Sequence, residues 1–275
     1  DRNADKDAGI SYGTNTGGSV LRFIINSDGS LVSNGYYPDR TLSMIVTTDE
    51  DGHMVETYNS KSGLTILERK IIGQGIIADT YYVYDRFLNL AMVVTPEGAA
   101  QVSSNATYST SGGVVKDYCY RHNYDYSGRL VLTIHPGGKY EGICYDNMNR
   151  PLITRNNVSG WITFQYDKCG RPLGQKKFKA PVPENAILAN PSYYSNYGNP
   201  VSETIYDSYP TGYSELAFKP VSGIVSISDI RNFCAGLKVQ ERFCDVSQEG
   251  LTNPASSVRR YYYDHLKRPV HIVER

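Results

Sequence analysis

Apolar and polar positions alternate along much of this chain in short runs, and clusters of turn residues separate the runs. Leu130 to His135 forms one alternating run, and Lys139 to Tyr145 forms the next. Pro136, Gly137 and Gly138 lie between them and predict a turn. Two strands and two turns of ordinary length account for a unit of about 21 residues. The pattern therefore predicts consecutive antiparallel β-hairpins.

A short phrase that begins with Tyr-Asp marks each predicted hairpin. It reads YDYSGRL at Tyr124, YDNMNRP at Tyr145 and YDKCGRP at Tyr166, at a constant spacing of 21 residues. A fixed period of this length is typical of stacked repeats. Weaker copies begin at Tyr84, Tyr206 and Tyr263. We interpret the repeat-motif residues as structural; they are Tyr84, Asp85, Tyr124, Asp125, Gly128, Arg129, Tyr145, Asp146, Asn149, Arg150, Tyr166, Asp167, Gly170, Arg171, Tyr263, Asp264 and Arg268.

The residues within each phrase predict a tight turn. Asp125 suits the start of a turn, because its side chain accepts hydrogen bonds from backbone amides two residues on. Gly128 supplies the positive φ that a hairpin turn needs, and Asn149 and Gly170 at the same position also tolerate it. Asp and Arg of one copy are expected to pair across the turn. At Tyr84 the turn prediction is weaker, because Leu88 and Asn89 occupy the positions that Gly128 and Arg129 hold in the first clear copy.

Other segments depart from the repeat. YNSKSGL at Tyr58 is interpreted as a degraded copy, with Asn59 in place of Asp and a displaced Gly63. The polar stretch from Gln101 to Gly113 predicts an exposed loop, and Ser228 to Gly236 is the best candidate for a short helix. We predict a flexible arm (residues 1–20), a hairpin-repeat region (21–178), a Pro-rich connection (179–202) and further repeat strands that end abruptly (203–275).

The phrase YDxxGRL, repeated about every twenty residues, resembles the YD repeats of bacterial rearrangement-hotspot (Rhs) proteins, insecticidal toxin-complex shells and teneurins. TTDEDGHMVETYNSKSGLTILERK and TYYVYDRFLNLAMVVTPEG are similar to the region upstream of the shell in large Rhs-type proteins of gut bacteria. Residues 20–275 or so resemble this family. The resemblance implies an all-β fold in which antiparallel hairpins form a curved or spiralling sheet, with at most one short helix.

The resemblance implies a structural function. In such proteins the hairpin strip forms a hollow shell around a C-terminal toxin, and a self-cleaving aspartyl segment follows the repeats. Neither that segment nor a toxin, plug or propeller is recognised here. The chain is thus expected to be non-enzymatic wall material of a secreted or cell-surface bacterial protein. Its expected partners are other repeat segments of the parent chain and an enclosed toxin domain or a surface glycan.

Composition excludes several other classes. Lys plus Arg and Asp plus Glu each number 28, so the chain lacks the basic field that nucleic acids and anionic membranes usually require. No apolar run approaches a membrane span, and no signal peptide is visible in this chain. The 24 tyrosines suit strands whose side chains are half buried, because the ring packs while the hydroxyl stays hydrated.

Candidate chemistry is sparse. The five cysteines lack zinc-site spacing, and their odd number and wide spacing do not suit a disulfide framework, which leaves room for one chance disulfide. The acidic run Asp49-Glu50-Asp51-Gly52 leads into a strand too soon for a calcium loop. The five histidines have no nucleophile at a recognisable spacing. We expect no catalytic residue, no metal and no cofactor.

Two rival functions remain open. An adhesion module would stack sugar rings on exposed aromatic side chains, for which Trp161, Tyr140 and Tyr82 are the candidates. The same aromatic residues also suit cross-strand packing. A glycoside hydrolase, the third hypothesis, would need a pair of carboxylates whose separation only a structure gives.

Overall fold

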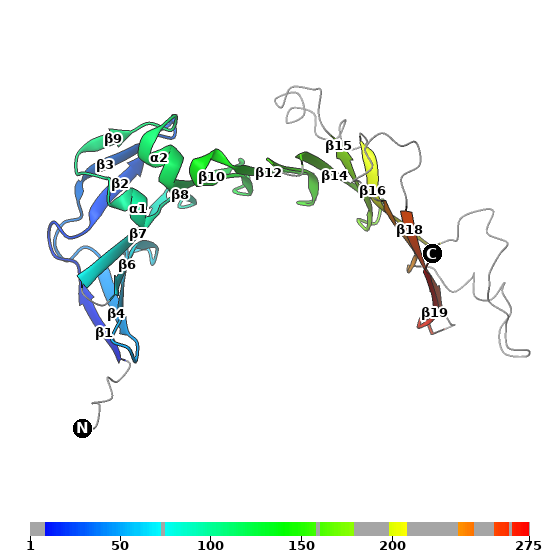
Figure 1. The fold of residues 1–275 in the computed structure, drawn as a ribbon, viewed down its shortest axis with the longest axis horizontal. Coiled ribbons are helices and arrows are strands. Elements are labelled where there is room, and N and C mark those ends of the chain that lie inside the picture. Colours follow the sequence, from blue (N-terminus) through cyan, green and yellow to red (C-terminus); the bar gives the residue numbers. More distant parts are fainter. Residues whose placement is uncertain are drawn as a thin grey trace, which may run out of the picture. The chain divides into compact units, whose positions relative to one another are not determined.

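The computed structural model describes residues 9–72, 75–157, 160–178, 198–207, 236–244, 256–263 and 266–274. The chain divides into two compact units, residues 1–142 and 143–275. The described strands pair antiparallel, and consecutive strands are joined mostly as hairpins (Figure 1). The prediction of an all-β antiparallel hairpin fold is confirmed.

The first unit contains a main sheet and a smaller second sheet. The main sheet has the strand order β1-β4-β5-β6-β7-β8-β10-β11-β12, and the small sheet has the order β2-β3-β9. The elements are β1 (Gly9–Thr14), β2 (Leu21–Ile25), β3 (Leu31–Tyr36), β4 (Ser43–Thr48), β5 (Met54–Asn59), β6 (Thr65–Ile72), β7 (Ile76–Tyr84), β8 (Leu90–Val94), α1 (Pro96–Ala99), β9 (Ala106–Tyr108), α2 (Gly113–Tyr118), β10 (Cys119–Tyr124), β11 (Leu130–Ile134), the 3-10 turn η2 (Pro136–Gly138) and β12 (Tyr140–Tyr145).

The core of the first unit lies between its two sheets. Figure 1 shows β2, β3 and β9 gathered with α2 beside β7 and β8. Leu31 from the small sheet and Leu67 and Val94 from the main sheet are each fully buried. Phe23 meets Tyr81 edge to face, with ring centroids 4.9 Å apart. Alternate residues of β7 thus face the small sheet, as a strand buried on one face requires.

The second unit forms a single sheet among its described residues. Its strands follow chain order, and its buried residues form small clusters around Ile153 and Trp161, and around Val239. The strands are β13 (Pro151–Asn156), β14 (Gly160–Tyr166), β15 (Pro172–Phe178), β16 (Asn199–Tyr206), β17 (Lys238–Cys244), β18 (Ser256–Tyr263) and β19 (Pro269–Glu274).

Several segments differ from expectation. Residues 9–14, expected to belong to a flexible arm, form β1 and pair with β4 along their whole length. β16 begins at Asn199, inside the predicted connection. The predicted exposed loop contains β9, which extends the small sheet, so tertiary pairing overrides its polar composition.

Helix content also differs. The described residues contain two short helices, α1 and α2, where at most one was expected. Thr95 caps α1 by accepting a hydrogen bond from the N–H of Gly98, and Pro96 occupies the first helical position. A Thr-Pro pair therefore starts the helical turn that follows β8. The helix predicted from Ser228 lies, apart from Gly236, outside the described residues.

Candidate functional site

The repeated turn is the chain's most regular feature, and one backbone geometry builds it. In each five-residue turn the first N–H donates to the carbonyl of the fifth residue, and the fourth N–H donates to the carbonyl of the first. The fourth residue has positive φ, as at Gly128 (75°), Asn149 (62°) and Gly170 (83°). Among the described residues, such turns begin at Asn26, Asp49, Ser60, Asp85, Asp125, His135, Asp146 and Asp167.

In the clear copies the aspartate carboxylate organises the turn. Asp125 Oδ1 accepts hydrogen bonds from the N–H of Ser127 (2.9 Å) and of Arg129 (3.0 Å), while Oδ2 accepts from Arg129 Nε (2.7 Å). Asp146 and Asp167 bind their own arginines in the same way, at 2.7 and 2.6 Å. One carboxylate thus supports the turn backbone and fixes the arginine side chain.

These contacts hold the carboxyls ionised. The backbone N–H of Arg129 lowers the pKa of Asp125, and the Arg129 guanidinium adds to this effect against partial desolvation. Desolvation acts to raise the pKa of Asp146, but the N–H and guanidinium of Arg150 together hold it below the ordinary value.

In three copies the motif tyrosine links its turn to the preceding one. All six motif tyrosines are the last residues of their strands: Tyr84, Tyr124, Tyr145, Tyr166, Tyr206 and Tyr263. The hydroxyl of Tyr166 donates to the carbonyl of Pro151 (2.9 Å), the residue that follows the preceding turn. Tyr84 and Tyr124 reach Thr65 and Leu90 equivalently, at 3.0 Å each. The tyrosine therefore ties neighbouring hairpins together along one edge of the sheet.

The arginine makes a second link in the same direction. The guanidinium of Arg150 lies over the ring of Tyr166, 4.4 Å from its centroid, and Arg171 lies over Tyr206 at the same distance. Each arginine is held by the aspartate of its own turn while it covers the tyrosine of the next. Aspartate, arginine and the following tyrosine thus form a chain of contacts from hairpin to hairpin.

The weaker copies keep the backbone turn although their side chains differ. Leu88 has φ 66°, and Asn89 Nδ2 donates to Asp85 Oδ2 at 3.0 Å where the clear copies use arginine. Lys267 has φ 60° in the glycine position of the last copy; Asp264 lies outside the described residues, and Arg268 directly precedes β19.

The interpretation of the degraded copy is wrong by one residue. Ser60, not Asn59, takes the aspartate position, because its N–H bonds the carbonyl of Leu64 and its Oγ accepts from the N–H of Leu64 at 3.2 Å. Gly63 is therefore in register, with φ 76°. Leu64 occupies the arginine position.

The copy at Tyr206 uses its aspartate differently. Asp207 accepts hydrogen bonds from both terminal nitrogens of Arg171 and from the N–H of Gly236 (2.6 Å). The Asp207 N–H donates to the carbonyl of Leu237, so this aspartate joins the end of β16 to the start of β17. The Arg171 guanidinium, followed by the Gly236 N–H, lowers the pKa of Asp207 to about 2.

We expect the Asp207 carboxyl to titrate with a midpoint of about 2, against about 3.9 in an unfolded chain. Because the pKa is lowered on folding, the stabilisation is complete above the unfolded value and is lost as pH falls through the folded one. NMR titration of the Asp207 side-chain carboxyl carbon checks this. In an Arg171→Met variant the midpoint should move most of the way back. A midpoint near the unfolded value in the parent chain would contradict the contact.

A double-mutant cycle can measure the coupling free energy between Arg150 and Tyr166. The single changes Arg150→Met and Tyr166→Leu and their combination should give a coupling free energy of about 0.5–1 kcal/mol from urea unfolding, since the stacked pair is partly exposed. Tyr166→Phe is the control, because it removes the hydroxyl bond to Pro151 but keeps the stacked ring. Additive single effects would mean that the stacking does not couple the hairpins.

Of the three aromatic residues considered for stacking on sugars, Trp161 is not exposed. Trp161 is buried, stacks on Phe178 with centroids 6.0 Å apart, and carries the Arg155 guanidinium at 4.8 Å. Its ring thus packs within the second unit instead of presenting an exposed face. Tyr140 and Tyr82, in β12 and β7 of the first unit, are partly buried.

Other clusters of reactive side chains belong to turns. Asp49, Asp51 and His53 bring ligand atoms within 4.8 Å of one another. However, Asp49 Oδ1 accepts the His53 N–H (2.8 Å) and Oδ2 lies 3.1 Å from His53 Nδ1, so these groups close the turn before β5. Within the described ranges, no helix is both long and apolar enough to cross a membrane.

Comparison with known proteins identifies the fold. No family model matches the chain, and no curated protein matches it. Among solved structures, a chain of the Photorhabdus luminescens Tc holotoxin pore with a TccC3 mutation matches 87% of this chain at 14% identity and a TM-score of 0.50. Crystal structures of TcdB2-TccC3, alone and with Cdc42, match 92% at 12% identity and a TM-score of 0.51. The chain spans 11% of the pore chain and 13% of each crystal chain, and over that stretch it shares their fold.

Proposed function

We propose that this chain is a non-enzymatic structural segment of a large bacterial Rhs-type YD-repeat protein. In this proposal it forms part of the wall of a β-shell that encloses or presents a toxin-like C-terminal cargo. Its partners are then the neighbouring repeat segments of the parent chain and the enclosed domain. The parent protein is secreted or displayed at the cell surface.

The observation that carries the proposal is the contact chain between hairpins. Asp146 fixes Arg150, Arg150 covers Tyr166, and the Tyr166 hydroxyl bonds back to the strand after the Asp146 turn. In this link the aspartate, arginine and tyrosine of the motif hold one hairpin against the next. Side-chain contacts between neighbouring repeats are what a continuous wall requires, because each unit of a stacked repeat is stabilised by its neighbours. The fold shared with toxin-complex chains supports the same function.

The carboxyl groups give no support to a glycoside hydrolase. A glycosidase needs one carboxylic acid with a raised pKa. The described carboxyls whose pKa departs from its ordinary value all shift downward; they are Asp28, Asp49, Asp125, Asp146, Asp167, Asp207 and Glu241. A carbohydrate platform is weakened as well, because its strongest stacking residue, Trp161, is buried.

Protease protection in the parent protein tests the proposal. The full-length gene product that contains these residues is treated with a nonspecific protease, and fragments are identified by mass spectrometry. A wall predicts that the region following the repeats resists cleavage until a denaturant opens the shell. The control is the same region expressed alone, which should be cleaved. Equal cleavage in both contexts would count against encapsulation. Saturable binding to a glycan array would instead favour adhesion.

A further inference from the structure

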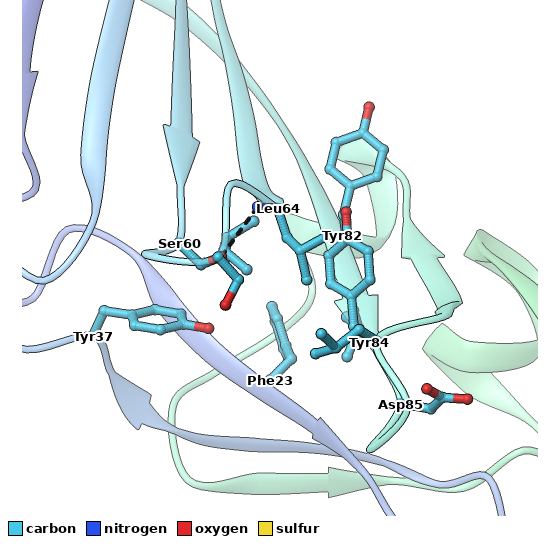
Figure 2. Close-up of a pocket in the computed structure, with 11 residues that line it drawn as sticks. Phe23, Tyr37, Ser60, Leu64, Tyr82, Tyr84 and Asp85 are labelled. Carbon is cyan, nitrogen blue, oxygen red and sulfur yellow. Dashed lines mark hydrogen bonds between the residues drawn. The ribbon is translucent and has the colours of Figure 1, made fainter.

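A pocket of about 250 Å³ lies in the first unit, beside the turns that begin at Ser60 and Asp85. Figure 2 shows aromatic side chains from both sheets facing this space, with Leu64 and Ser60 from the first turn. The lining residues used below are Phe23, Tyr37, Ser60, Leu64, Tyr84 and Leu88. Within the described part of the chain the Tyr37 hydroxyl has no hydrogen-bond partner, and Figure 2 shows it directed toward the interior of the pocket.

In the clear copies an arginine side chain occupies the position that corresponds to this pocket. In a clear copy, Arg150 lies between the aspartate of its own turn, the ring of Tyr166 and the turn glycine of the next copy. Its Nη1 would be 3.1 Å from a Cβ placed at Gly170. The corresponding residues around the pocket are Ser60, Tyr84 and Leu88, as the turn register sets them.

The Tyr84 side chain makes the same hydroxyl-to-carbonyl hydrogen bond as the Tyr166 side chain. Its hydroxyl bonds the carbonyl of Thr65, the residue after the preceding turn, at 3.0 Å. The two sites therefore share their geometry, and they differ in the residue that reaches over the ring. Leu64 is too short to place a group where a guanidinium would lie, and Ser60 has no carboxylate to hold one. The pocket is thus the position of a missing repeat arginine, closed on its far side by Phe23 and Tyr37 of the small-sheet region.

The neighbouring turn places a negative charge, the Asp85 carboxylate, beside this pocket. Asp85 lines the pocket, and its carboxylate is bonded by the N–H of Phe87 (2.8 Å) and by the backbone and side chain of neutral Asn89. In the clear copies the arginine at the fifth turn position binds this carboxylate, whereas here that position holds the neutral Asn89, and the turn's Arg86 lies over the ring of Phe87, 4.7 Å from its centroid. No lysine or arginine lines the pocket. Arg22 acts on the Tyr37 hydroxyl from outside the lining.

We propose that this pocket binds an arginine side chain presented by a partner polypeptide. The guanidinium would stack on Tyr84 as Arg150 stacks on Tyr166, with Tyr37 on the opposite side and, at the rim, the Asp85 carboxylate, which forms no ion pair among the described residues. An arginine fits better than an apolar side chain, because aromatic faces and a carboxylate without an ion pair together favour a planar, weakly hydrated cation. The inference concerns a partner site in the wall and is independent of any enclosed cargo.

The test uses the full chain and two small probes that differ only in charge. Nα-acetyl-arginine N-methylamide and its neutral analogue Nα-acetyl-citrulline N-methylamide are titrated into the protein. Binding is followed by NMR of the Tyr37 and Tyr84 ring signals. We expect saturable shifts with the arginine probe and about tenfold weaker binding of the citrulline probe. Absence of shifts with arginine, or equal affinity for both probes, would overturn the proposal.

A matched variant fills the site with the chain's own arginine. Ser60→Asp combined with Leu64→Arg rebuilds the regular turn, and it should weaken probe binding about tenfold without lowering the Tm. Asp85→Asn keeps the Oδ1 acceptor for the turn but removes the charge, so it should also weaken binding of the arginine probe. Undiminished arginine binding in a folded Ser60→Asp, Leu64→Arg protein would overturn the assignment, and the citrulline comparison in the parent chain stands whether or not either variant folds.

Discussion

Replacing Gly174 by alanine is expected to separate β15 from β16. A Cβ at this position would lie 2.3 Å from the carbonyl oxygen of Ser202 and 3.2 Å from Cα of Glu203. Both are backbone atoms of the paired strand, so no side-chain rotation relieves the overlap. We expect the free energy of unfolding of the second unit to fall by more than about 3 kcal/mol. Denaturant unfolding gives the loss, and hydrogen exchange should show faster exchange of the amides in both strands.

Gly142→Ala is the matched control for this substitution. Gly142 also lies in a repeat strand, but its Cβ would meet Val131 O at 3.7 Å and Leu132 Cδ1 at 3.9 Å, which are ordinary contacts. We expect a change within about 0.5–1 kcal/mol, in the stabilising direction, because alanine lowers the entropy of the unfolded chain. Similar losses for Gly174→Ala and Gly142→Ala would show that close strand approach is not what Gly174 provides.

Asn15→Ala should produce the second large loss, in the first unit. The buried Asn15 side chain accepts hydrogen bonds from the N–H of Thr41 (2.9 Å) and of Leu42 (2.8 Å) and donates to the carbonyl of Pro38 (2.8 Å). The bond to Leu42 is buried and the other two are partly buried, so alanine, which leaves all three backbone groups without this partner, should cost about 2–4 kcal/mol. Urea unfolding monitored by far-UV circular dichroism measures the difference.

Asn34→Ala provides the comparison for the Asn15 change. Asn34 is exposed in β3, and its side chain forms no hydrogen bond with any described residue. Its replacement should alter stability by less than about 0.5 kcal/mol. If Asn15→Ala behaved like Asn34→Ala, the hydrogen bonds of the Asn15 side chain would not stabilise the first unit, and the predicted loss would be wrong.

Turn chemistry could be predicted from the sequence wherever the residues are the usual ones. Gly128, Asn149 and Gly170 directly predict positive φ. Asp125 followed four residues later by Arg129 predicts the Asp–Arg ion pair. Leu88 could not be predicted, because leucine rarely adopts positive φ, and only the strands on both sides impose it. The register at Ser60 was missed because Tyr58-Asn59 imitates the Tyr-Asp dipeptide one residue too early.

The links between hairpins could not be predicted, because they join residues that the period alone does not bring together. Arg171 and Tyr206 lie on opposite sides of a long connection, yet they stack at 4.4 Å. Only strand pairing places β16 beside β15 and so brings the two side chains into contact. The small sheet is similar, since β9 joins β3 through pairing that its polar composition does not announce. Burial of Trp161 likewise follows from Phe178 across β14 and β15.

Electron cryo-microscopy of the full-length parent polypeptide tests the central claim most directly. If the chain is wall material, the map should show these residues within a continuous β-strip that encloses density for another domain. The Tyr-Asp turns should then follow one edge of the strip, in contact from hairpin to hairpin. A map in which the same residues stand apart as an isolated arm, with no enclosed space, would contradict the structural role proposed for them.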